Sequence, residues 1–220
     1  MNTSTKNTAA QILEALTGDI LEGEYLPGEK LHIKTLKERY EVGTSPLREA
    51  LSQLIAKDLV VSENQRGFYV SDISIDDLED IYQARAKIEA LCIQMAIEKG
   101  DDYWEANCLA AMHRLNKSST EANIDFKEWQ KRHSAFHSDL VTGCASPRLL
   151  PIRQSLFEKS TRYRNLWLRE NVTNIDTLGV NQKEHTELLN LVLERDIKGA
   201  TQLVQAHILT PVAIIKNALT

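Results

Sequence analysis

The sequence predicts a mainly α-helical protein in which a small N-terminal winged helix-turn-helix precedes a larger antiparallel α-helical bundle. Two observations support this prediction. The first 72 residues show three apolar stripes at helical spacing, followed by two short β-type runs. Beyond residue 75 the apolar spacing stays helical almost to the end of the chain. We therefore expect domains at 1–72 and 78–220, joined by a linker at 73–77.

The first two helices are marked by their boundaries. Thr8 is a plausible N-cap, and apolar residues recur at helical spacing from there until Gly23, which suits a helix end. A Leu-Pro-Gly segment then breaks the pattern, and a short second helix is expected over 33–40.

A turn and a third helix follow. Thr44 or Ser45 can cap this helix, because Pro46 falls in its first turn, where a missing N–H costs nothing. The β-type runs at 59–61 and 68–70 are separated by a polar turn and predict a hairpin. Helix, helix-turn-helix and hairpin are the order of a winged helix.

In a helix-turn-helix the second helix enters the major groove of DNA, so its outward N-terminal residues can touch bases. Thr44, Ser45 and Arg48 occupy those places. In the hairpin, Arg66 beside Gly67 is placed to reach the minor groove. Arg48 can bind a guanine edge or a phosphate, and both options remain open. The alternative is that the two arginines are ordinary solvated surface charges.

The charge balance counts mildly against a nucleic-acid partner. The chain has a net charge of −5, and residues 1–72 hold 8 Lys and Arg against 11 Asp and Glu. Any DNA contact must therefore depend on a locally basic face. A homodimer would help, because two weak footprints on one duplex add their phosphate contacts.

Composition also limits the location of the protein. With 220 residues and 42% hydrophobic residues, the chain can build two modest cores. It has neither an apolar run of about 18 residues nor the pattern of a secretory signal, so we expect a cytoplasmic protein without a membrane segment. Cys92, Cys108 and Cys144 are an odd number without close pairing, which predicts reduced core residues.

We expect six helices in the larger domain, and the last two, near 177–195 and 198–218, form an antiparallel pair. Arg85 lies on the apolar stripe of the first of these six helices and must be paired. Two solutions remain open: an internal ion pair with Glu89, or a fork onto the carboxylate of a bound ligand. Of Arg162 and Arg164, on a later helix, we expect one to point inward as well.

Four histidines of this domain are expected to face inward. His133 and His137 are four residues apart and share a helix face. His185 and His207 lie on the apolar stripes of the two last helices. Satisfied structural histidines would give the same pattern, but four inward imidazoles suit a divalent transition metal such as zinc or nickel, with an open position for a carboxylate.

The segment PGEKLHIKTLKERYEVGTSPLREALSQLIAKDLVVSENQRGFYV resembles the DNA-binding half of the GntR family, and the match covers residues 8–72. PLREAL is its strongest part, and the Arg-Gly-Phe of the hairpin is the next. The resemblance implies operator contacts by the following residues: Lys34, Thr44, Ser45, Arg48, Arg66 and Gly67. Thr44 departs from the pattern, since some relatives have an arginine there.

The larger domain resembles the FCD ligand-binding domain of the FadR-type subfamily, an antiparallel helical bundle. The markers are IYQARAKIEA, RHSAFHSDLVTGCASPRLL and the two late histidines, over about 76–218. In metal-containing relatives the ligands are an aspartate and three histidines. His137, His185 and His207 match those histidines, and His133 stands at the place of the aspartate. The nearest resemblance is to the carbon-starvation-induced regulator group.

The sequence thus predicts a homodimeric transcriptional regulator, a repressor, that binds double-stranded operator DNA and responds to a small carboxylic acid in the helical domain. The alternative is a small metal-dependent hydrolase with an appended nucleic-acid-binding domain. Against an enzyme, no carboxylate is obviously placed as a general base, although Asp139 and Glu184 are close in sequence to the histidines.

Overall fold

The structure, a computed structural model, describes residues 8–63, 66–119, 126–171 and 175–219. These residues form two compact units. One holds the chain up to Leu78 together with Glu158–Glu170, and the other holds Glu79–Phe157 and Asn171–Ala218. The expected linker at 73–77 therefore lies just before the first division, while one later helix is shared between the units.

The first unit begins with three helices, α1 (Ala9–Leu21), α2 (Ile33–Arg39) and α3 (Thr44–Ala56). Thr8 is the N-cap of α1, as predicted, and forms a capping box with Gln11. The prediction for α3 was one residue out. Gly43 is its N-cap and makes no side-chain hydrogen bond, so Thr44 is already the first helical residue.

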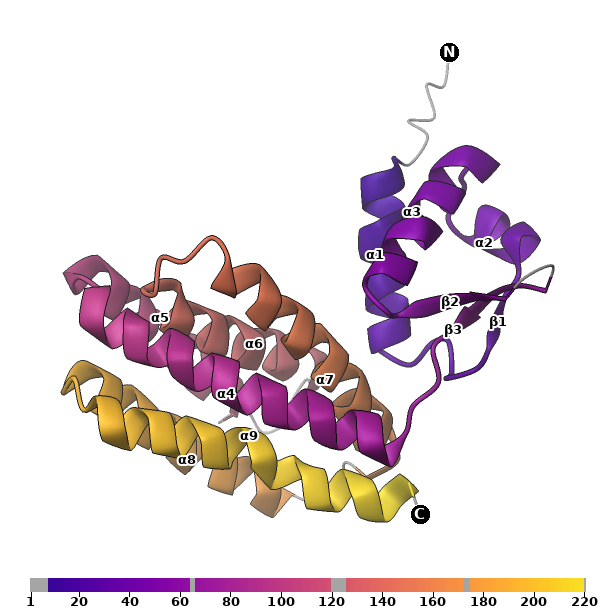
Figure 1. Cartoon of the computed structure of the whole chain (residues 1–220). Coiled ribbons are helices and arrows are strands. Elements are labelled where there is room, and N and C mark those ends of the chain that lie inside the picture. The colour runs from indigo at the N-terminus through magenta and orange to yellow at the C-terminus, as the bar shows by residue number, and fades with distance from the viewer. Residues whose placement is uncertain (1–7, 64–65, 120–125, 172–174, 220) are drawn as a thin grey trace. The chain divides into compact units, whose positions relative to one another are not determined.

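The first unit also contains a three-stranded antiparallel sheet (Figure 1). The predicted hairpin is present as β2 (Val60–Glu63) and β3 (Gly67–Val70). A further strand, β1 (Lys30–Leu31), pairs with the other edge of β3, giving the order β1-β3-β2. Sequence reasoning missed β1 because two residues are too few to show an alternating pattern.

The core of this unit is built from the inward faces of its three helices and the sheet. Leu16 of α1 and the α3 residues Leu47, Leu51 and Leu54 are fully buried. One side of α3 is therefore committed to the core, and its other side is left for a partner.

The helical domain contains the six predicted helices: α4 (Ile75–Lys99), α5 (Asp102–Ser119), α6 (Phe126–Thr142), α7 (Leu149–Asn171), α8 (Ile175–Leu193) and α9 (Ile197–Leu219). The short α8–α9 connection makes these two helices antiparallel, as predicted (Figure 1). Arg195 in that connection donates to the backbone oxygens of Ile97 and Gly100, so it binds the C-terminal end of α4.

Cys92, Cys108 and Cys144 are buried free thiols, and burial raises the pKa of Cys92 and of Cys108 to about 12. They are core residues of the helical domain, as predicted. Among the described helices, none has the length and apolar character that crossing a membrane requires.

Candidate metal centre and nucleic-acid interface

The outer face of α3 presents the residues predicted to read DNA. Leu47 and Leu51 turn the opposite face into the core. Thr44, Ser45 and Arg48 are exposed at the N-terminal end of the helix. The helix therefore offers two hydroxyls and one guanidinium at the end that a winged helix-turn-helix inserts into the major groove.

The β2–β3 hairpin carries a second exposed arginine. The Arg66 side chain is 77% exposed and lies 3.5 Å from the Glu63 carboxylate. Such an exposed, screened pair is weak, so the guanidinium can exchange it for another anion. Gly67 has φ +112°, a conformation that favours glycine. Residues 64–65 of the intervening turn lie outside the described residues.

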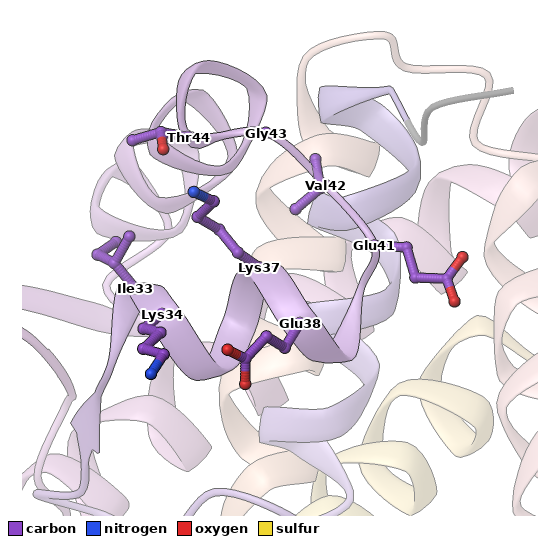
Figure 2. A pocket seen from close by; sticks show the side chains of 8 residues that line it. All are labelled: Ile33, Lys34, Lys37, Glu38, Glu41, Val42, Gly43 and Thr44. Atoms are coloured by element: carbon purple, nitrogen blue, oxygen red, sulfur yellow. The ribbon is translucent and has the colours of Figure 1, made fainter. Parts of the chain in front are cut away.

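An open groove of about 840 Å³ runs along α2 and across the turn to the first residue of α3 (Figure 2). Lys34, predicted to contact operator DNA, lines it and is exposed. The groove shares Thr44 with the outer face of α3, so the two features form one continuous surface.

The four predicted histidines converge. The Nε2 atoms of His133, His137 and His185 lie 3.1–3.2 Å from one another, and the Nε2 of His207 lies 3.2 Å from that of His185. All four ligand nitrogens fall within 4.8 Å of one another, and all four side chains are buried. Sequence spacing predicted the inward faces of α6, α8 and α9, and the structure brings those faces to one point.

Hydrogen bonding between the imidazoles accounts for at most two of these four Nε2 contacts. Each Nε2 of a neutral imidazole carries either one proton or one lone pair and so makes one bond. Three mutually adjacent Nε2 atoms, those of His133, His137 and His185, cannot all be matched to one another. A central cation accepts all their lone pairs, and ligand nitrogens about 2.0–2.1 Å from a metal lie roughly 2.9–3.4 Å apart. The observed distances fit that range.

The surroundings favour the neutral form of His137 and hold His207 in place. Burial, then the neighbouring imidazoles and Arg85, lower the pKa of His137 well below its ordinary value. His207 Nδ1 lies 2.6 Å from the Glu184 carboxylate, which lowers the pKa of Glu184. An Nδ1–H donated to Glu184 leaves the Nε2 lone pair of His207 free for a metal. Trp129 stacks on His133.

A buried ion pair joins α4 and α7 of the same domain. Glu89 of α4 receives two hydrogen bonds from Arg153 of α7, at 2.7 and 2.8 Å, and both residues are at most 2% exposed. Arg153 also donates to Ser138 of α6. Both oxygens of Glu89 thus bind Arg153. Arg153, which the sequence pattern did not single out, therefore takes the place that Arg85 was one candidate to fill as the partner of Glu89.

Arg85 is buried. The guanidinium groups of Arg85 and Arg153 both lie over the aromatic ring of Phe157. Each guanidinium carbon is 4.9 Å from the centre of the Phe157 ring. Burial lowers the pKa of Arg85, and Glu89 opposes that shift. Spacing could have revealed Arg153, since Arg153, Phe157 and Ser160 recur on the buried face of α7.

The other predicted effector-binding arginines belong to the first compact unit. Arg162 is inward-facing, as expected of one of the pair, but its guanidinium donates to the backbone oxygen of Ser71. Next to it, the Tyr163 hydroxyl donates to Asp77 at 2.6 Å. Arg164 is half-buried. The structure therefore places Arg85 in the unit that holds the histidine cluster, where it helps to lower the pKa of His137, and places Arg162 in the other unit.

Both parts of the chain match known protein families. Residues 8–70 match the family described as bacterial regulatory proteins, gntR family, and residues 80–210 match the FCD domain. The chain is 43% identical over 208 residues to the HTH-type transcriptional repressor GlaR of Escherichia coli K12, covering 93% of this chain and 94% of GlaR. The chain belongs to the GntR family.

Other relatives of this GntR regulator extend the same result. BphR of Paraburkholderia xenovorans LB400, an uncharacterized HTH-type transcriptional regulator, is 32% identical and covers 93% of this chain and 83% of BphR. The solved structure of E. coli McbR/YncC has the same fold, with a TM-score of 0.83 at 19% identity over 96% of this chain and 98% of that one.

The family establishes the broad function. The chain is a DNA-binding transcriptional regulator whose C-terminal FCD domain makes its DNA binding ligand-responsive. The hydrolase alternative receives no support from any of these relatives, because they are named as regulators.

The buried ion pair gives the first prediction. Arg153→Met should lower the free energy of unfolding by about 3–5 kcal/mol, because it leaves the Glu89 carboxylate buried without its partner. Glu89→Leu combined with Arg153→Met should recover much of that loss. Urea unfolding followed by circular dichroism measures both.

Lys216→Met provides the matched control. It removes one partner of the exposed Lys216–Glu79 pair and should cost about 1 kcal/mol or less. An Arg153→Met variant no less stable than this control would contradict the assigned role of the buried pair.

Proposed function

We propose that this GntR regulator is a homodimeric repressor that reads a roughly two-fold symmetric operator with α3 and the β2–β3 hairpin. The exposed Arg48, Thr44 and Ser45 support this role for α3, and exposed Arg66 supports it for the hairpin. A dimer is supported by charge: one head with more acidic than basic residues has few phosphate contacts, and two heads on one duplex add theirs. The repressor assignment is supported by the relative GlaR.

The convergence of four Nε2 atoms is the observation that carries the second part of the proposal. His133, His137, His185 and His207 would hold a divalent transition ion such as zinc or nickel. When bound, the ion would supply a positive centre with room for an anionic oxygen of the effector. Glu184 would orient His207 by accepting its Nδ1–H.

Arg85 is the proposed effector-binding residue, and a small carboxylic acid is the proposed effector. The charges of Glu89 and Arg153 balance each other through two hydrogen bonds. Arg85 adds a further buried positive charge, close enough to His137 to lower the pKa of that imidazole. A carboxylate forked onto Arg85 would form charge-assisted hydrogen bonds where water is excluded.

Effector binding would then alter operator binding through a difference in affinity. The effector must bind the DNA-bound and DNA-free conformations unequally, and each tenfold difference corresponds to about 1.4 kcal/mol. By linkage, operator DNA must weaken or strengthen effector binding by the same factor.

The reading role of α3 is tested by Arg48→Ala. An operator is first selected from random duplexes with the wild-type chain. The variant should lose selective retardation of that duplex while keeping its helical content, because Arg48 is exposed and supports no core contact. Selective binding that survives in Arg48→Ala would remove α3 from the role of reading helix.

The metal proposal is tested by elemental analysis after zinc or nickel reconstitution. Wild type should retain close to one equivalent, and His185→Ala and His207→Ala should retain much less, because each loses one ligand. Glu184→Gln should bind metal about 10–100-fold more weakly, since it loses the carboxylate that orients His207. His113→Ala, which removes an exposed histidine of α5, is the control. A wild-type protein holding less than about a tenth of an equivalent would make the histidines structural.

The effector proposal is tested by thermal melting against small mono- and dicarboxylic acids. At least one acid should raise the melting temperature of the metal-loaded protein and change its operator affinity. Arg85→Gln should abolish that shift, whereas Arg148→Gln, which changes an exposed arginine just before α7, should keep it. An unchanged shift in Arg85→Gln with normal metal content would show that the effector binds elsewhere.

A further inference from the structure

Lys37 lies on α2 and faces the start of the reading helix. Lys34 and Lys37 are three residues apart, so they lie on one side of α2, and both line the groove. Figure 2 shows the Lys37 side chain directed toward Gly43 and Thr44, across the turn from its own helix. Its ammonium group is therefore presented beside the first turn of α3.

The first turn of α3 has no cation of its own, since it begins Thr44-Ser45-Pro46. Arg48, the first basic residue of the helix, comes one turn later. Lys37 therefore supplies positive charge at the N-terminal end of α3, whose first turn has none.

The two acidic residues that line the groove do not neutralise this lysine. In Figure 2 the Glu38 side chain leaves the opposite side of α2, and Glu41 points away from Lys37 and from α3. Within the described part of the chain, Lys37 makes no ion pair with either. Its charge is thus available to a partner outside the chain.

Most other cations of the DNA-binding half already have a partner within the chain. Among residues 8–72, Arg39 pairs with Asp19, Lys57 pairs with Glu158, and Lys30 lies over the Tyr69 ring. The described cations left for an external anion are Lys34, Lys37, Arg48 and the loosely paired Arg66. In a head with an excess of acidic residues, each of these four carries a large share of any attraction to DNA.

We propose that Lys37 contacts an operator phosphate and thereby positions the N-terminal end of α3 on the DNA. In a helix-turn-helix the first helix of the motif crosses the sugar-phosphate backbone while the second enters the groove. An ammonium group on a flexible stem suits a phosphate, which it meets as a point charge from many directions. This contact adds affinity and register without reading sequence.

The inference rests on the proposed role of α3, and the salt dependence of binding isolates it. Each phosphate contact contributes about 0.9 to the slope of log K against log salt concentration, so two Lys37 residues in a dimer contribute about 1.8. Loss of a base contact changes selectivity instead. The two roles therefore give different signatures in one titration.

The experiment measures the affinity of the full chain for the selected operator and for an unrelated duplex of equal length, between about 50 and 200 mM salt. Lys37→Gln should melt as wild type does, and its slope should be shallower by about 1.8 on the operator. At low salt it should weaken binding to both duplexes by similar factors. Lys37→Arg should keep the wild-type slope, and Lys99→Gln, an exposed lysine at the end of α4, should change nothing.

An unchanged slope in Lys37→Gln would overturn the proposal. So would a loss confined to the operator with relaxed preference at one base pair, since that indicates a base contact. Failure of the proposed function looks different: it appears as selective binding by Arg48→Ala, whatever the slope of Lys37→Gln.

Discussion

The helical domain depends on one constraint: four buried imidazole nitrogens meet at a point where hydrogen bonds between them account for at most two of their four close contacts. His133 and His137 come from α6, His185 from α8 and His207 from α9. Burial keeps His137 neutral, so the electron pairs at the centre are available for a cation. Glu184 accepts a hydrogen bond from Nδ1 of His207, which leaves the Nε2 lone pair of His207 available as well. Under the proposed metal binding, coordination would join these three helices in addition to packing.

Buried charged side chains also connect helices of this domain. Glu89 and Arg153 join α4 to α7 through a two-point ion pair, and Phe157 lies against both Arg153 and Arg85. The same helix, α7, also carries Tyr163, whose hydroxyl binds Asp77 in the first compact unit. One helix therefore contributes to the interior of each unit, and its two ends are bound by different polar contacts.

In the DNA-binding half, acidic residues outnumber basic ones, although DNA is itself negatively charged. Several of its cations are held by internal partners: Arg39 pairs with Asp19, and Lys57 pairs with Glu158. The remaining cations are on α2, α3 and the hairpin. Attraction to DNA is therefore concentrated on one surface and does not come from overall charge.

Local pattern determined much of this protein from sequence alone. Apolar spacing located the helices, Thr8 marked the start of α1, and the i, i+4 spacing of His133 and His137 put both on one helix face, because these features depend on near neighbours. Tertiary structure alone decided that four histidines from three helices share one centre and that Glu89, 64 residues from Arg153, binds that arginine and leaves Arg85 beside the centre. Partners so far apart in the chain are chosen by how the helices pack, since burial forces each charge to find an opposite one wherever the fold brings it.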